Sequence, residues 1–301
     1  MSDPRQRRLD DGSIVRAAPA KLNVFLRIRG ARDDGYHDLE SLVLPLSLAD
    51  TVTVASADAL RVDVGGDDAF TSAVDAGGMN LALVAALALG ESCSGGPTGA
   101  TITIDKRIPV AAGLGGGSAD AAAVLLALQS LWGCGLDTET LLEIAARIGS
   151  DVPSMVLGGA VVLRGRGERL EPVDVVPTWW CVVPFDFPTR SPDAYRWWDD
   201  QGGVTGPDPA PALDAIREGN VGELGRLLHN DLEPVVVARH PVIGRTKEAL
   251  LDAGALGAVM SGSGPTVVAL ARTELHATEL AGAFPGAITV SAPWSGAGSV
   301  G

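Results

Sequence analysis

Cysteine is scarce in this chain, which has Cys93, Cys134 and Cys181 in 301 residues. Their odd number and wide spacing, together with four scattered histidines, match neither a disulfide framework nor the ligand spacing of a zinc site. We therefore expect no disulfide and a reducing compartment, which excludes the small disulfide-stabilised proteins.

Long apolar runs are also missing. The longest, residues 81–89, is about half of what a membrane-spanning helix needs. The chain starts with a basic Arg-Gln-Arg-Arg run but has no apolar segment behind it, so no secretory signal is predicted. We expect a cytoplasmic protein with no membrane partner.

Basic residues are outnumbered, with 23 Lys and Arg against 37 Asp and Glu and a net charge of −14. Such a balance disfavours nucleic acid as a partner and leaves a small molecule as the expected ligand. The hydrophobic content of 46% and mean hydropathy of +0.22 suffice for one large core or two ordinary ones, which excludes a disordered chain.

Hydrophobic periodicity predicts an α+β protein in two halves. A hairpin around Gly165-Arg166-Gly167 closes the first half, so the predicted domains are residues 1–165 and 166–301. In the first half we expect strands at 14–28, 41–48, 51–55, 61–64 and 101–106, and helices at 80–89, 118–131 and 138–148. In the second half we expect strands at 179–183 and 287–291, helices near 213–228, 242–253 and 274–283, and two strands flanking residues 261–264.

Glycines gather in the segment Pro109-Val-Ala-Ala-Gly-Leu-Gly-Gly-Gly-Ser-Ala-Asp120, between a predicted strand and a predicted helix. Glycine lets the backbone approach a ligand closely, and the start of a helix offers unpaired N–H groups with a positive dipole end. Four glycines in five positions exceed what a tight turn needs. The segment therefore predicts a phosphate-binding loop, with a plain strand-to-helix connection as the alternative.

The residue spacing in this segment can be compared with that of three known kinds of loop. A Walker A loop needs a Gly-Lys-Ser/Thr sequence, and no lysine is present here. A dinucleotide-binding fingerprint needs glycine at the sixth position from Gly113, where this chain has Ser118. A hydrolase nucleophile elbow needs glycine where Asp120 stands. All three kinds of site are disfavoured.

Two further segments carry groups suited to phosphoryl transfer. Asp151 in Gly149-Ser-Asp-Val-Pro153 is placed like a helix N-cap, but beside a phosphate loop its carboxylate could take the proton of an attacking hydroxyl. Lys21 and Asn23 share one face of a predicted strand, which is either a solvated edge or a surface that binds substrate. A lysine near Asp151 would keep that carboxylate ionised. The residues alone do not decide whether Asp151 is a cap or a base, or whether Lys21 and Asn23 face solvent or substrate.

Two turns add weaker signals. Tyr36 and His37 could stack on a planar base and hydrogen-bond it, although single loop histidines are usually without a function. The same caution applies to Ser191 and Tyr195. The segment Ser261-Gly-Ser-Gly264 is either a second turn near the phosphates or a simple hairpin.

Five segments together resemble the GHMP small-molecule kinases in their order and spacing, over about residues 17–270. They are Pro19-Ala-Lys-Leu-Asn23, Gly35-Tyr-His-Asp-Leu39, the glycine loop, Gly149-Ser-Asp-Val-Pro153 and Met260-Ser-Gly-Ser-Gly264. The resemblance implies an α+β fold with an N-terminal domain like domain 2 of ribosomal protein S5 and a ferredoxin-like C-terminal domain, with the active site between them.

The resemblance also implies an activity. Within the family, the segments most specifically resemble members that transfer the γ-phosphate of ATP to the 2-hydroxyl of a methylerythritol linked to cytidine diphosphate. A mevalonate- or homoserine-type kinase, or a non-catalytic nucleotide-binding homologue, is the alternative, and a dinucleotide-binding protein is a weaker one. Both a monomer and a homodimer are compatible with it.

Site residues follow from the resemblance, position by position. Lys21 and Asp151 match the catalytic pair, with Asp151 as general base. The positions expected to bind ATP are Asn80, Lys106, Pro109, Gly113, Leu114, Gly115, Gly116, Gly117, Ser118, Ala119 and Asp120. Those expected to hold the substrate are Asn23, Tyr36, His37, Ser191 and Tyr195. Mg²⁺ is expected with ATP, and Ser118 is its candidate ligand, because the glutamate that many family members use is not identifiable here.

Overall fold

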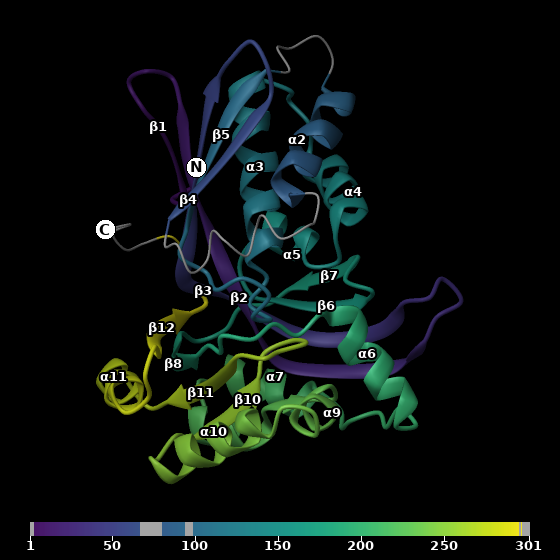
Figure 1. Cartoon of the computed structure of the whole chain (residues 1–301), viewed down its shortest axis with the longest axis vertical. Helices are drawn as coiled ribbons and strands as arrows, with labels where there is room; N and C mark the ends of the chain where they lie inside the picture. Colours follow the sequence, from purple (N-terminus) through teal and green to yellow (C-terminus); the bar gives the residue numbers. More distant parts are fainter. Residues whose placement is uncertain (1–2, 67–79, 94–98, 295, 297–301) are drawn as a thin grey trace.

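A computed structural model of the chain describes residues 3–66, 80–93, 99–294 and 296, whose strands form two sheets (Figure 1). The larger sheet has the strand order β1-β2-β3-β5-β4. In addition, β6 pairs with β3, β7 pairs with β6, and β9 pairs with β2. Its strands are β1 (Gln6–Arg8), β2 (Ile14–Ala31), β3 (His37–Ser56), β4 (Arg61–Gly66), β5 (Ala100–Lys106), β6 (Val161–Gly165), β7 (Arg169–Pro172) and β9 (His229–Asn230).

Four helices, α2 (Leu81–Ser92), α3 (Gly116–Trp132), α4 (Thr138–Ile148) and α5 (Val152–Leu157), lie together on one side of this sheet (Figure 1). Helix α3 packs on β2 and β3 and against α2. Small side chains make this packing close, because the buried faces of both helices are rich in alanine. The result is a tight layer that fixes where α3 begins.

The smaller sheet is antiparallel in the order β10-β11-β8-β12 and lies below the larger one in Figure 1. Its strands are β8 (Thr178–Val183), β10 (Gly257–Met260), β11 (Val267–Ala271) and β12 (Ile288–Ala292). Helices α10 (Pro241–Asp252) and α11 (Glu274–Gly282) pack on it, and Trp180 is fully buried in the core. The same part of the chain contains α6 (Ser191–Asp200), α7 (Ala210–Arg217), α8 (Val221–Leu227) and α9 (Glu233–Val237).

Most predicted elements compare well with these bounds, but the helix expected near 213–228 is two helices, α7 and α8, and one strand is longer than expected. Two strands were predicted at 41–48 and 51–55, but β3 continues from one to the other. Asp50 lies between the two predicted ranges. Its carboxylate is buried and accepts hydrogen bonds from the backbone N–H groups of Arg107 and Ile108. The strand therefore passes through this polar residue at no cost in unpaired groups.

The predicted boundary at residue 165 remains a prediction. β7 and β9 both follow that residue in the chain, yet both belong to the larger sheet. β9 pairs in parallel with β2, with Phe25 opposite His229 and Leu26 opposite Asn230. The second half of the chain thus contributes directly to the sheet that carries Lys21.

The expectation of no disulfide is wrong. Cys93, just after α2, is bonded to Cys134, just after α3, although 41 residues separate them in sequence. The two helices lie side by side and end close together, which brings the cysteines into reach. Cys181 is buried and unpaired within the described residues. The cysteine argument for a reducing compartment therefore fails.

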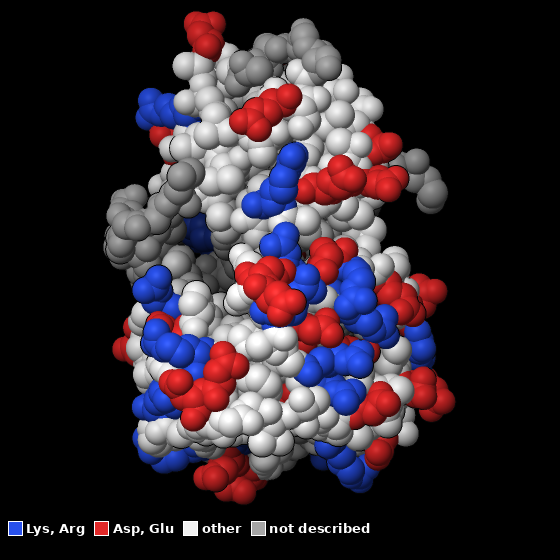
Figure 2. Space-filling model, turned by 90° about the vertical axis from the view of Figure 1, so that its right-hand side faces the viewer, with Lys and Arg blue, Asp and Glu red and all other residues white. Residues whose placement is uncertain are grey.

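Over the ranges that the structure describes, no helix is both long and apolar enough to cross a membrane. Figure 2 shows acidic and basic side chains interspersed on the face that it presents, over the lower half of the molecule.

Candidate active site

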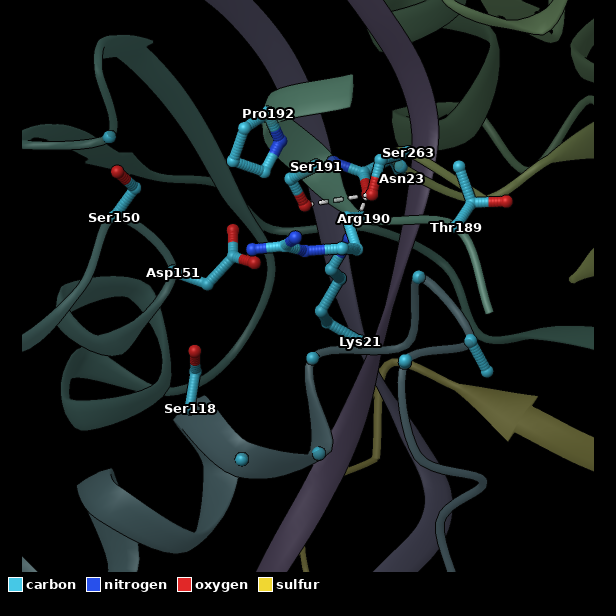
Figure 3. A pocket seen from close by; sticks show the side chains of 18 of the residues that line it. Lys21, Asn23, Ser118, Ser150, Asp151, Thr189, Arg190, Ser191, Pro192 and Ser263 are labelled. Carbon is cyan, nitrogen blue, oxygen red and sulfur yellow. Dashed lines mark hydrogen bonds between the residues drawn. The ribbon is translucent and has the colours of Figure 1, made fainter. Parts of the chain in front are cut away.

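A cleft of about 1350 Å³ is lined by residues from β2, the segment 109–118, the start of α6 and the turn at 262–263. It brings together both sheets, because β2 belongs to the larger sheet and the turn joins β10 to β11 of the smaller one. Figure 3 shows Lys21, Ser118 and Asp151 around the same space.

The glycine loop connects β5 to α3, as predicted. Gly115 is the N-cap residue of α3 in the left-handed region, with φ +69°, and Gly113 has φ +77°. The first N–H groups of α3 therefore face the cleft without a side chain in front of Gly116 and Gly117. Such a helix start is suited to an anion.

Not every loop position faces the cleft. Leu114 and Ala119 are buried in the core and are absent from the cleft wall as the structure describes it, whereas the other predicted positions from Gly113 to Asp120 line it. Leu114 has another contact, because its carbonyl accepts a hydrogen bond from the backbone N–H of Lys21 at 2.9 Å. This bond ties the loop to β2.

Lys21 and Asn23 lie on one face of β2, and the solvated-edge alternative is wrong. Their exposed fractions are 5% and 4%. The Lys21 ammonium donates to Oδ1 of Asn23, and Nδ2 of Asn23 donates to Oγ of Ser41 at 2.9 Å. Burial lowers the pKa of Lys21, and the negative charge of Asp151 opposes that effect. The two predicted catalytic side chains thus share one electrostatic environment.

Asp151 occupies the N-cap position of α5, with Pro153 in the first turn, as its motif indicated. Its side chain nevertheless makes no capping hydrogen bond within the described part of the chain. It lines the cleft instead. Asp137 is a useful contrast, since its carboxylate does cap α4 by accepting from the N–H of Thr140 at 2.9 Å. The carboxylate of Asp151 is therefore available to a ligand.

Lys106 lies beneath the loop and is bound by two acids. Its ammonium donates to Asp50 and to Asp120, the latter at 2.7 Å, and the residue is 3% exposed. The two carboxylates outweigh burial and raise the pKa of Lys106, while burial raises the pKa of Asp120 to about 7. A β-carbon at Gly116 would lie 3.4 Å from Nζ of Lys106. The lysine therefore supports the start of α3 from below.

Among the positions expected to bind ATP, Asn80 and Lys106 are those that the resemblance places near the adenosine. Both line the cleft, as does Pro109. Asn80 is also the N-cap of α2, where its Oδ1 accepts from the N–H of Ala82 at 2.9 Å. Nucleotide contact by these residues stays a prediction.

The five predicted substrate residues, Asn23, Tyr36, His37, Ser191 and Tyr195, all line the cleft. The ring of His37 stacks on Tyr195 with centroids 4.9 Å apart, and its Nε2 lies 2.9 Å from Oδ1 of Asp199. Burial, and next the charge of Asp151, raise the pKa of Tyr195. This phenol therefore stays neutral close to the predicted base.

Ser191 begins α6, a helix that the sequence analysis did not expect. Its hydroxyl lies 2.8 Å from that of Ser263 in the turn after β10 (Figure 3). Tyr36 lies at the outer end of the cleft, 49% exposed, with the guanidinium of Arg166 5.2 Å from its ring centroid. The wall of the cleft thus includes aromatic faces as well as the glycine loop.

Sequence reasoning missed three cleft-lining arginines, Arg166, Arg190 and Arg196. Single arginines in turns carry no local signal. Only the pairing of β6 with β7 and the start of α6 bring them to the cleft.

A resident metal site is not evident, because no group of three or more His, Cys, Asp or Glu side chains able to hold a metal ion occurs among the described residues. Ser118 offers one hydroxyl oxygen in the first turn of α3, on the cleft wall. Asp120 carries an unpaired buried oxygen within the described chain, but two positions along a helix place it on a different face from Ser118. One hard oxygen donor fits Mg²⁺ that keeps phosphate and water as its other ligands.

Comparison with known proteins decides the family. The model of the GHMP kinases N terminal domain matches residues 80–159, and that of the GHMP kinases C terminal matches residues 212–287. The chain belongs to the GHMP kinase family. The matched ranges contain the glycine loop, Asp151 and the turn after β10.

Curated relatives of this GHMP kinase include the 4-diphosphocytidyl-2-C-methyl-D-erythritol kinase of Symbiobacterium thermophilum, 44% identical over 83% of this chain and 87% of the relative. The kinase of the same name from Nocardioides sp. is 42% identical over 90% and 92%. A crystal structure of 4-(cytidine 5'-diphospho)-2C-methyl-D-erythritol kinase matches with a TM-score of 0.77 and 35% identity, over 92% of this chain and 98% of that one. Leishmania major mevalonate kinase, at 15% identity and a TM-score of 0.68, shares the fold.

Proposed function

We propose that this GHMP kinase transfers the γ-phosphate of ATP to the 2-hydroxyl of 4-diphosphocytidyl-2-C-methyl-D-erythritol, giving the 2-phosphate and ADP. Identity of about 40% to kinases of that name, over most of both chains, supports the substrate. The fold alone would also allow mevalonate or homoserine as acceptor, since kinases for both share it.

One observation carries the mechanism: Asp151 stands at the start of α5 without capping it and faces the cleft that also contains Lys21 and the glycine loop. As the hydroxyl oxygen attacks the γ-phosphorus, the hydroxyl proton passes to the carboxylate of Asp151, and the bond from phosphorus to the bridging oxygen of ADP breaks. A carboxylate already engaged in capping would be a poorer proton acceptor.

Lys21 has two tasks in this scheme. Its ammonium attracts the Asp151 carboxylate, whose charge opposes the lowering of the Lys21 pKa by burial, and it offsets negative charge on the transferring phosphoryl group. The hydrogen bond to Asn23 and the burial of both side chains hold the ammonium in one position. Held in this way, it needs little reorganisation during the reaction.

The N–H groups at the start of α3 bind the nucleotide phosphates, and glycine at 115–117 leaves room for them. Ser118 would hold the Mg²⁺ that accompanies ATP, and the bound ion would supply positive charge that offsets the phosphate charge. Lys106 pairs with Asp50 and Asp120 beneath this helix start, and Lys106 and Asp120 also line the cleft.

At the other end of the cleft, Tyr36, His37 and Tyr195 offer faces for the cytosine ring. Asn23 and Ser191 line the same cleft and are suited to hydroxyl and phosphate oxygens of the substrate.

The remaining assignments also belong to this proposal. The enzyme works in the cytoplasm, where ATP is supplied, as a monomer or homodimer and with no nucleic-acid partner. The net charge of −14 supports the last point.

ADP release by the purified protein with Mg-ATP tests the function. Release is expected with the cytidyl substrate and not with mevalonate, homoserine or no acceptor. Turnover with another acceptor would be consistent with a GHMP kinase but would contradict the proposed substrate. No turnover with any acceptor, while ATP binds, would favour the non-catalytic homologue.

A further inference from the structure

Asn230 is a buried amide outside the predicted site. It is 3% exposed and ends β9, the short strand that pairs with β2 a few residues beyond Lys21 and Asn23. No signal in the sequence pointed to it. Its place on β9 attaches it to the strand that carries the catalytic lysine.

All three hydrogen bonds of its side chain are short. Nδ2 donates to the carbonyl oxygens of Met260 and Gly262, each at 2.7 Å, and Oδ1 accepts from the N–H of Leu232 at 2.9 Å. The two carbonyls flank Ser261, so the amide holds the turn after β10 on both sides of that serine. Only an NH₂ group can donate to two carbonyls here.

The turn that Asn230 holds touches the glycine loop. Oγ of Ser261 donates to the carbonyl of Gly113 at 3.2 Å. A β-carbon at Gly113 would lie only 2.2 Å from the carbonyl oxygen of Ser261, so the two backbones are in direct contact.

The same turn touches the catalytic strand. A β-carbon at Gly262 would lie 2.6 Å from Nζ of Lys21 and 3.1 Å from Oδ1 of Asn23. The N–H of Asn23 also donates to Oγ of Ser261, at 3.4 Å. The turn is therefore one wall against which both the lysine ammonium and the phosphate loop rest.

We infer that Asn230 is a positioning residue for phosphoryl transfer: by holding the turn at residues 260–262, it sets the place of the Lys21 ammonium relative to the glycine loop. It acts through the turn and touches neither substrate. This inference rests on the proposed function, since it gives Lys21 and the loop their roles in catalysis.

The test replaces the Asn230 amide with a carboxylate, the group closest to it in shape. Asn230→Asp keeps the shape but presents an oxygen to two carbonyls, which leaves buried acceptors unpaired and pushes the turn away. We expect kcat to fall at least about 30-fold and the Kd of a non-hydrolysable ATP analogue to rise about fivefold, with the Kd of CDP within about twofold of wild type. Calorimetric titration should still give about one nucleotide site per chain.

Asn220→Asp is the matched control. Asn220 caps α8 through Oδ1, which accepts from the N–H of Glu223, and aspartate caps equally well. Its kinetic constants should stay within about twofold of wild type. Should Asn230→Asp fail to fold, Ser261→Ala removes only the hydroxyl contacts to Gly113 and Asn23, and a fall in kcat of at least about fivefold is expected.

The outcomes separate the two claims. Wild-type turnover is measured first, and its absence would overturn the proposed function itself. With wild-type turnover in hand, unchanged kcat in Asn230→Asp would overturn the positioning role. Equal loss of affinity for the ATP analogue and CDP, or a reduced number of sites, would show a general structural role and also overturn it.

Discussion

Gly115 and Lys21 are in direct contact: a β-carbon at residue 115 would lie 3.0 Å from Cγ of the lysine. It would also lie 2.6 Å from Cε of Met155, the flexible end of a side chain. The phosphate loop and the catalytic strand thus meet at a glycine, and the distance between them leaves no room for a side chain.

This contact predicts that Gly115→Ala impairs nucleotide binding beyond its effect on stability. Gly133, at the other end of α3, has the same φ of +69° but open space around it, so Gly133→Ala carries the same backbone strain without the contact. Gly133→Ala should lose about 1 kcal/mol of unfolding free energy from backbone strain, and Gly115→Ala should lose more because its β-carbon also meets Met155 and Lys21. Only Gly115→Ala should also raise the Kd of an ATP analogue at least about tenfold, and Gly115→Val should abolish binding. Equal affinities in the two alanine variants would contradict the account.

The local parts of this site could be predicted from the sequence because their signals are local. Glycines at 113–117 before an apolar helix, and alternation that places Lys21 beside Asn23, each report on a few neighbouring residues. The structure has both features where they were expected. The free carboxylate of Asp151 could not be predicted in this way, because a capping and a non-capping aspartate have the same sequence pattern.

Features that depend on distant segments escaped prediction. The amide of Asn230 acts on carbonyls about thirty residues later in the chain, and the Cys93–Cys134 disulfide depends on two helices ending side by side. Helix α6 was missed because most of its residues are polar: only Ala194 and Trp198 are buried, although these two lie on one face. Its position is fixed instead by tertiary contacts such as the stacking of Tyr195 on His37.

The pH dependence of turnover should reflect Lys21. Its pKa lies below the ordinary value of 10.5, so kcat should fall on the alkaline side before pH 10.5, as the ammonium loses its proton. In Lys21→Arg the guanidinium stays charged, and this fall should vanish even though the maximal rate is lower. A wild-type kcat that stays flat through pH 10.5 would contradict the role of the charge.

The lowered pKa of Lys21 should also affect stability: the free energy of unfolding should rise with pH over the range in which kcat falls. The folded state disfavours the Lys21 ammonium, so the cost is present in full below the folded pKa and disappears as pH rises from there to 10.5. Relative to Lys21→Met, the unfolding free energy of wild type should therefore increase over that interval, as chemical denaturation can measure. A decrease would contradict burial as the cause.

Reduction of the Cys93–Cys134 disulfide should destabilise the protein. Closing a loop with a sequence separation of 41 residues restricts the unfolded chain, so Cys93→Ser should lower the unfolding free energy by about 4 kcal/mol. Cys181→Ser is the comparison, because that thiol is buried and unpaired within the described residues and should be unaffected by reductant. Denaturation with and without reductant measures both, and identical curves for wild type would contradict the pairing.

The aromatic end of the cleft should govern affinity for the cytidyl substrate. His37→Ala removes the ring stacked on Tyr195 and should raise the KM of that substrate about tenfold, with nucleotide affinity unchanged. His276→Ala on α11 is the control, since that histidine is half-buried against Arg272 and is not among the described residues that line the cleft. A rise in the KM of ATP, with none for the cytidyl substrate, would reverse the orientation of the two ligands.

The central claim is that Asp151 accepts the proton of the attacking hydroxyl, and kcat of Asp151→Asn tests it most directly. Asp137→Asn is the matched variant, because Asp137 caps its helix and asparagine caps equally well. The account predicts a fall in kcat of at least about 100-fold for Asp151→Asn, with the Kd of an ATP analogue within about twofold, and wild-type kcat for Asp137→Asn. Near-normal turnover by Asp151→Asn would contradict it.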